Sequence, residues 1–209
     1  MSVYTTDQQQ IEQFQQWWKL HGTSTVLMII FALALGFGWR FWVQHHEQQL
    51  AQASVNYEQL LNSVVNNDST NANTIANSLM QDYARTPYAP LAALMLARQD
   101  VDQSNFTDAE TKLQWVIEHT HNKSLRQVAR LRAARVLLAE NQPQLALNML
   151  NKIDDNAYLP AIDEVSGDCY VALGQIDQAR MSYLTATKIL PGYDVAQPIL
   201  RMKLDNLVK

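Results

Sequence analysis

The sequence predicts an all-α protein in which a single apolar helix precedes a solenoid of paired helices. Three observations lead to this prediction: residues 22–39 are uncharged, small and aromatic residues recur at helical-repeat spacing after residue 160, and Gly and Pro number only six each. A chain of 209 residues with so few glycines and prolines lacks the frequent turn signals of a sheet protein. Its hydrophobic content of 47% is too high for a disordered chain.

The apolar segment near the amino terminus predicts a transmembrane helix. Residues 22–39 read GTSTVLMIIFALALGFGW and contain no charged side chain. At a rise of about 1.5 Å per residue, this segment and its aromatic flanks, which include Trp18 and Trp42, span a hydrocarbon layer of about 30 Å. Tryptophan rings at such flanks sit at the level of the lipid headgroups. We therefore expect a membrane span over residues 22–43.

Two alternatives compete with an uncleaved anchor. A cleaved signal peptide would begin with basic residues, whereas Asp7 and Glu12 stand in that region. A buried core helix of this length rarely lacks charge on every face. Lys19 and Arg40 place one basic residue on each side of the span, so charge does not decide its orientation. Residues 1–21 are short and polar, which favours a cytoplasmic amino terminus.

The clearest helical repeat covers residues 160–191. Its small, aromatic and terminating residues are Gly167, Tyr170, Gly174, Ala179, Tyr183, Ala186 and Pro191. Their spacing resembles the tetratricopeptide repeat, in which small residues stand where two helices touch and aromatic side chains fill the gap between them. Gly174 falls in the predicted turn, where glycine readily adopts a left-handed backbone. Asp163 and Ser166 depart from the pattern, because the repeat usually has Trp and Leu there.

Similar small residues recur toward the amino terminus. Ala146, Ala109 and Ala76 precede Ala179 at steps close to one repeat length. The step from Ala109 to Ala146 is the longest, which predicts a longer loop around residues 119–123. The predicted repeat units are residues 47–84, 88–120, 125–156 and 160–191.

The sequence also predicts where the repeat domain begins and where it ends. The last repeat of a solenoid must cover its apolar face, so a helix near residues 195–208 is expected to cap the stack. The first helix of the domain, residues 44–66, follows the predicted span with almost no linker. We therefore expect the repeat domain to cover residues 44–209 and to lie close to the bilayer.

The first helices of the pairs are expected to line a concave groove. In each first helix the inward positions are counted from a small residue, which is Gly167, Ala134 or Ala97. The candidate protein-binding residues are Leu91, Leu94, Arg98, Val128, Leu131, Arg135, Glu164 and Asp168. Such a groove would be apolar in its middle and acidic toward its carboxyl end, which suits a peptide or an amphipathic helix. The alternative is that the apolar members pack against the second helices.

Composition and motifs argue against catalysis and nucleic-acid binding. The net charge is −4, and no basic stripe runs along the sequence. One arginine cluster, interpreted as a solvated helix face, consists of Arg126, Arg130, Arg132 and Arg135. The single cysteine, Cys169, excludes an internal disulfide and a cysteine-based zinc site. The sequence has no phosphate-binding loop, zinc-protease motif or serine-hydrolase motif, so we expect no enzyme activity and no cofactor.

The whole chain resembles the YfgM family, whose members are ancillary subunits of the bacterial SecYEG translocon. The resemblance rests on the span, the four degenerate repeats and the junction GWRFW at residues 38–42. It implies a single-pass inner-membrane protein whose repeat domain is periplasmic. It also implies a non-catalytic role that links protein export to periplasmic chaperones. The partners that it implies are translocon subunits, a membrane-anchored chaperone of prolyl-isomerase type and nascent exported chains. A membrane-anchored scaffold for envelope assembly or cell division is the alternative.

Overall fold

The structure, a computed structural model, describes residues 4–188 and 197–207 of the chain. These ranges consist of helices joined by short connections, and they contain no strand. The chain divides into two compact units, Met1–Gln49 and Leu50–Lys209. The first unit contains most of helix α1 (Tyr4–Val65), and the second contains the end of α1 and all the other helices.

The part of α1 in the first unit exposes a series of large apolar side chains. They are Met28, Ile30, Phe31, Leu33, Leu35, Phe37, Trp39, Phe41 and Trp42. Several positions of the span predicted over residues 22–43, among them residues 22–25, lie outside the described side chains. Within the residues whose side chains the structure describes, no helix is both long and apolar enough to cross a membrane.

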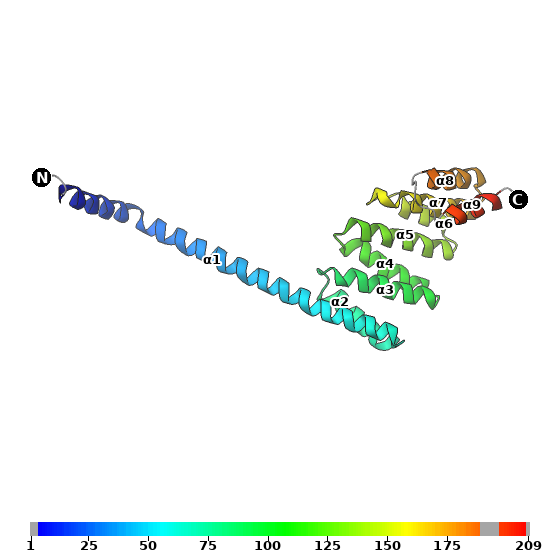
Figure 1. The fold of residues 1–209 in the computed structure, drawn as a ribbon, viewed down its shortest axis with the longest axis horizontal. Coiled ribbons are helices and arrows are strands. Elements are labelled where there is room, and N and C mark those ends of the chain that lie inside the picture. Colours follow the sequence, from blue (N-terminus) through cyan, green and yellow to red (C-terminus); the bar gives the residue numbers. More distant parts are fainter. Residues whose placement is uncertain (1–3, 189–196, 208–209) are drawn as a thin grey trace. The chain divides into compact units, whose positions relative to one another are not determined.

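The second unit is a stack of helical pairs (Figure 1). The end of α1 pairs with α2 (Ser69–Asp82), α3 (Tyr88–Asp102) with α4 (Phe106–His119), α5 (Lys123–Ala139) with α6 (Pro143–Leu150), and α7 (Leu159–Ala172) with α8 (Ile176–Lys188). A short 3-10 helix, η1 (Asn156–Tyr158), precedes α7, and α9 (Gln197–Asn206) follows α8. Each predicted repeat unit therefore contains one pair of helices, and the predicted capping helix corresponds to α9.

The turn within each pair has the same backbone conformation in all four pairs. One residue per turn has a positive φ: Asn67 (55°), Ser104 (61°), Asn141 (59°) and Gly174 (73°). The next residue donates its N–H to the carbonyl five positions earlier, at 2.9 Å from Asp68 to Ser63, 2.8 Å from Asn105 to Asp100, 2.8 Å from Gln142 to Leu137 and 2.9 Å from Gln175 to Tyr170. This bond closes a helix end with a left-handed residue. The turn expected at Gly174 is confirmed.

The common turn also corrects two expectations about the repeat register. The buried alanine that follows each turn residue by five positions is Ala72, Ala109, Ala146 or Ala179. Ala72 is therefore the equivalent of Ala109, and the assignment of Ala76 was wrong by one helical turn, since both alanines face the same core. The expectation of a longer loop around residues 119–123 is also wrong. The connection is residues 120–122, and the extra length lies in α5, which has 17 residues against 14 in α7.

The core of the second unit runs through the stack from one pair to the next. Leu60, Ala76 and Leu96 belong to a cluster that joins α1, α2 and α3. Equivalent clusters join α3, α4 and α5, and then α5, α6 and α7. At the end, Leu200 of α9 is 3% exposed and packs with Tyr183 of α8. Each helical pair is thus stabilised mainly by its neighbours, as in other solenoids.

We expect Gly174→Ala to lower the free energy of unfolding by about 1 kcal/mol, because φ at Gly174 is 73° and side chains disfavour that backbone. A Cβ at this position would meet nothing within 4 Å, so the cost is one of backbone conformation alone. Urea unfolding of the full chain, followed by circular dichroism, measures the change. Asn141→Gly at the equivalent turn is the matched control and should be neutral or stabilising. Unchanged stability of Gly174→Ala would contradict the expectation.

Candidate functional site

In the first helix of each pair, side-chain positions can be compared by counting back from the left-handed turn residue. Leu60, Ala97, Ala134 and Gly167 each precede the left-handed turn residue by seven positions, and all four are buried. The small size of three of them lets neighbouring helices approach closely. The predicted groove residues were counted from three of these positions, so their places in the structure can be compared directly.

A groove of about 560 Å³ opens along α1, α2 and α3. Tyr57 and Val64 of α1 contribute to its wall, and Leu91, Leu94 and Arg98 of α3 contribute beside them. Arg132 of α5 and Asp102 of α3 also border the groove. The structure thus brings together the three candidate residues that the sequence placed on α3.

A second hollow of about 310 Å³ lies between α3, α4 and α5. It shares Arg98 and Arg132 with the first groove, and Arg135 is added on α5. Val101 of α3 and Phe106 of α4 give this hollow apolar walls. Because the two hollows share residues, we treat them as one site and call it the arginine groove.

The three arginines of the arginine groove are not equally compensated. Arg98 forms an exposed ion pair with Asp102, with 2.9 Å between Nε and Oδ1. Among the described residues, Arg132 and Arg135 have no carboxylate partner, and Arg132 donates only a long hydrogen bond of 3.5 Å to the Leu94 carbonyl. Burial and then the charges of Arg98 and Arg135 lower the pKa of Arg132. An arginine stays protonated at neutral pH even so, and the groove is therefore positively charged.

Sequence reasoning missed the role of Arg132, because it treated the four arginines of α5 as one solvated face. The structure divides them into two pairs. Arg126 and Arg130, four residues apart, turn toward Asp154, whereas Arg132 and Arg135, three residues apart, border the groove. The helical spacing was the available signal, since residues three or four apart share a face and those two apart do not.

Two other candidate residues lie outside the arginine groove. Leu131 is 5% exposed and packs in the core cluster of α5, α6 and α7. Val128 is half-buried and borders neither hollow. Leu94 belongs both to the groove wall and to a core cluster. The alternative interpretation, in which the apolar members pack against the second helices, agrees with the cluster of Leu131 and α6 and in part with that of Leu94 and α4.

The carboxylates of Glu164 and Asp168 contact a lysine from the end of the chain. Lys203 of α9 lies 2.8 Å from Glu164 Oε1 and 2.7 Å from Asp168 Oδ2, and the Tyr183 hydroxyl donates to Asp168 Oδ1 at 2.7 Å. These contacts hold the capping helix α9 against α7, and the one positive charge of Lys203 is shared between the two carboxylates. One lysine shared by two carboxylates leaves this cluster with a net negative charge, and the binding role expected of Glu164 and Asp168 stays a prediction.

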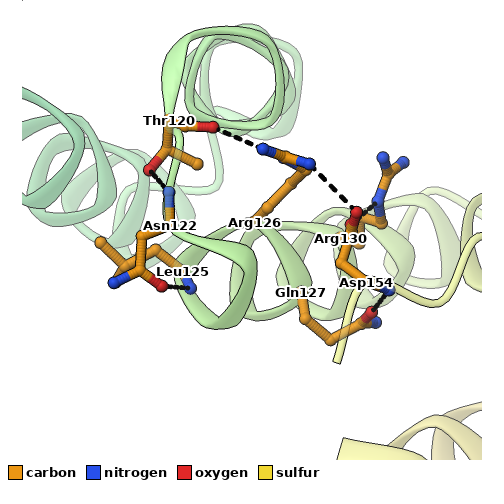
Figure 2. A network of polar contacts seen from close by, with 7 residues as sticks. All are labelled: Thr120, Asn122, Leu125, Arg126, Gln127, Arg130 and Asp154. Atoms are coloured by element: carbon orange, nitrogen blue, oxygen red, sulfur yellow. Dashed lines mark hydrogen bonds and ion pairs between the residues drawn. The ribbon is translucent and has the colours of Figure 1, made fainter. Parts of the chain in front are cut away.

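A polar network secures the beginning of α5, which carries the groove arginines (Figure 2). Arg130 Nε lies 2.7 Å from Asp154 Oδ2, and Arg126 Nη1 lies 3.2 Å from Asp154 Oδ1. Arg126 also donates to the Thr120 carbonyl at 2.8 Å, and the Asp154 N–H donates to Gln127 Oε1 at 2.8 Å. The network ties the connection after α6 to α5. This connection is irregular and lacks the backbone hydrogen bonds of a helix, so side chains hold it in place.

The described residues offer little for catalysis. The Cys169 thiol is fully buried, and burial, followed by the charge of Asp168, raises its pKa to about 11. A thiol in that state is a packing residue and a poor nucleophile. In the part of the chain that the structure describes, no three His, Cys, Asp or Glu side chains gather as a metal site would require. The arginine groove itself presents arginines beside apolar walls, a surface that can bind a ligand.

Comparison with known proteins gives one consistent result. A family model described as a tetratricopeptide repeat-like domain matches residues 15–209. A Haemophilus influenzae protein named ancillary SecYEG translocon subunit is 30% identical over 207 residues, which cover 99% of this chain and 100% of that protein. Its namesake in Escherichia coli is 25% identical over 209 residues, with 99% of both chains covered. A Neisseria gonorrhoeae protein of the same name is 27% identical over 209 residues. No solved structure gives a significant match.

Proposed function

The chain belongs to the family of tetratricopeptide repeat-like ancillary SecYEG translocon subunits, and from this membership we propose that it is a non-catalytic accessory subunit of the Sec translocon. The observation that carries the proposal is similarity over the full length to relatives of that name. The arginine groove and the buried, unreactive Cys169 agree with a role in binding.

The proposal includes a membrane anchor over residues 22–43, with residues 1–21 in the cytoplasm and residues 44–209 in the periplasm. Support comes from the uncharged sequence of residues 22–39 and from the exposed apolar side chains along α1, such as Phe37 and Trp39. Apolar side chains on all faces of a helix suit a lipid environment. Alkaline extraction of membranes tests the anchor: an inserted span keeps the chain in the pellet, and its release into the supernatant would contradict this part of the proposal.

The repeat domain would act as the adaptor. We place its partners in three classes: translocon subunits, a membrane-anchored periplasmic chaperone of prolyl-isomerase type, and nascent exported chains. The names of the relatives support the first class, and the groove supports a peptide-like ligand for the other two. In this arrangement the translocon would hold the subunit where exported chains emerge.

A crosslinking pull-down tests the proposed function. The full chain is crosslinked in intact membranes, extracted in detergent and analysed by mass spectrometry, with an unrelated single-span protein of equal abundance as the control. Enrichment of translocon subunits over the control is the expected result. Enrichment of envelope-assembly or division proteins, with no translocon subunit, would reject the proposed function in favour of the membrane-anchored scaffold.

A further inference from the structure

We propose that the arginine groove binds an acidic, amphipathic segment of a partner protein, with carboxylates of that segment paired to Arg132 and Arg135 and its apolar side chains against the α3 side of the groove. The inference deepens the proposed function and rests on it for the kind of partner. The observations that carry it are the distribution of charge in the groove, its apolar walls and its extent.

The charge of the groove is opposite in sign to that of the protein. The chain carries a net charge of −4, yet three arginines and one aspartate border the two hollows. Asp102 pairs with Arg98, which leaves Arg132 and Arg135 without a carboxylate among the described residues. Guanidinium groups that lie close together repel one another, and an anionic ligand relieves this repulsion. Arg also matches a carboxylate in geometry, since it can donate two parallel hydrogen bonds.

The other arginines of α5 show that this arrangement is not general to the helix. Arg126 and Arg130 both reach Asp154 (Figure 2). Their side chains are 27% and 12% exposed. The chain therefore supplies an internal carboxylate to one face of α5 and none to the groove face. Arg132 and Arg135 are exposed, so their charges are accessible to an anionic ligand.

The walls of the groove favour a protein segment over a free anion. Leu91, Val64 and Tyr57 border one hollow, and Val101 and Phe106 border the other. Val64 is 42% exposed, so this apolar surface is accessible to solvent. A segment that carries apolar residues on one side and carboxylates on the other would satisfy both kinds of surface.

The size of the groove points to the same ligand. The hollows of about 560 and 310 Å³ adjoin through Arg98 and Arg132, so the site extends across α1, α3 and α5. Three successive first helices thus contribute to one surface, and a peptide of several residues can contact all of them. An inorganic anion would occupy only the part beside the arginines.

Fluorescence anisotropy of a labelled peptide tests the inference on the full chain in phosphatidylcholine nanodiscs. The probe is a synthetic peptide of about 20 residues, with leucines at helical spacing and glutamates at the polar positions. A second peptide has glutamine in place of every glutamate. We expect the glutamate peptide to bind at least about ten-fold more tightly than the glutamine peptide, because several glutamates can pair with the exposed arginines of the groove.

Two double variants, which change the net charge by the same amount, show where the peptide binds. Arg132→Glu with Arg135→Glu should weaken binding of the glutamate peptide by about ten-fold or more. The matched control, Arg85→Glu with Arg180→Glu, changes exposed arginines on the connection after α2 and on α8, and it should leave binding within about two-fold. Equal loss in both variants, or no loss in either, would overturn the inference. Arg132→Gln with Arg135→Gln repeats the test without charge reversal, should the first variant unfold.

Two further outcomes separate this inference from its competitors. Displacement of the peptide by phosphatidylglycerol vesicles, but not by phosphatidylcholine vesicles, would assign the groove to an anionic lipid and overturn the inference. The groove variant is also used in the crosslinking pull-down. If the groove variant loses peptide binding but still enriches translocon subunits, the groove is a separate binding site, as the inference requires. If the wild type binds the peptide but enriches no translocon subunit, the proposed function is rejected and the inference about the groove stands.

Discussion

Asp154→Ala lowers the free energy of unfolding by about 3 kcal/mol in our expectation, because two arginines lose at once the one carboxylate that pairs with them among the described residues. The side chains of Arg130, Arg126 and Asp154 are 12%, 27% and 17% exposed, so water replaces the lost partner incompletely. Removal of one partner of a buried ion pair usually costs more than the pair itself contributes. Urea unfolding of the full chain at pH 7 measures the change. The matched control is Asp102→Ala, whose pair with Arg98 is 58% and 73% exposed and should contribute about 0.5 kcal/mol or less.

The same network gives the stability a defined dependence on pH. Burial alone would raise the pKa of Asp154, but the hydrogen bonds and charges of Arg130 and Arg126 outweigh it and hold the pKa below its ordinary value. A carboxyl group with a lowered pKa stabilises the fold above its unfolded pKa of about 3.9, and the contribution is lost as pH falls through the folded pKa. The difference in the free energy of unfolding between the wild type and Asp154→Ala should therefore have its full size at pH 7 and become smaller below about pH 4. A difference that stays constant to pH 3 would show that the charge of Asp154 is not its source.

The helical pairs could be predicted from the sequence because their determinants are local. Gly174 and its equivalents set each turn, and a buried alanine follows each of them five residues later. The register of the first pair was missed, since Ala72 and Ala76 lie one helical turn apart and both face the core. The error concerned one turn of helix, and the pairing of the helices did not depend on it.

The candidate site was less predictable, because contacts with residues distant in sequence decide which charged side chains are paired and which are not. Lys203 is 35 residues from Asp168, and no local pattern indicates that it pairs with Asp168 and Glu164. Asp154 is 24 residues from Arg130, and its contact divides the arginines of α5 into a paired face and a groove face. The α3 candidates were placed together because they lie on one helix. Arg132 was missed because the four arginines of α5 were treated as one face; their spacing separates two faces, but only the packing of α5 against α3 shows which face borders the groove.

In each helical pair a small residue of one helix faces a large residue of the other, and among the described glycines Gly167 alone has a neighbouring side chain where a Cβ would lie. Its counterpart on the second helix is Tyr183, and the equivalent pairs are Leu60 with Ala76, Ala97 with Leu113, and Ala134 with Leu150. In the first three pairs a small residue shares its core cluster with a large one, and in the last pair the Tyr183 ring lies against Gly167. The last pair is the extreme case, because the larger residue is a tyrosine and the smaller one has no side chain.

We expect Gly167→Ala to lower the free energy of unfolding by about 2 kcal/mol. A Cβ at this position would collide with the Tyr183 ring, which is 2% exposed and held by its hydrogen bond to Asp168. Overpacking lowers stability by up to about 3 kcal/mol, and the better helix propensity of alanine offsets about 1 kcal/mol of this loss. Urea unfolding of the full chain gives the value. Stability at or above that of the wild type would mean that the ring moves aside without cost.

The double variant Gly167→Ala with Tyr183→Leu tests the cause of that loss. It recreates the combination of Ala134 and Leu150 found in the preceding pair, which the fold already accommodates. The double variant should be more stable than Gly167→Ala alone, although it forgoes the hydrogen bond of 2.7 Å from Tyr183 to Asp168. Tyr183→Leu alone leaves an under-packed site beside the glycine and should be destabilised. Purely additive losses in the double variant would reject a steric conflict between the two positions, because independent sites add whereas residues in contact do not.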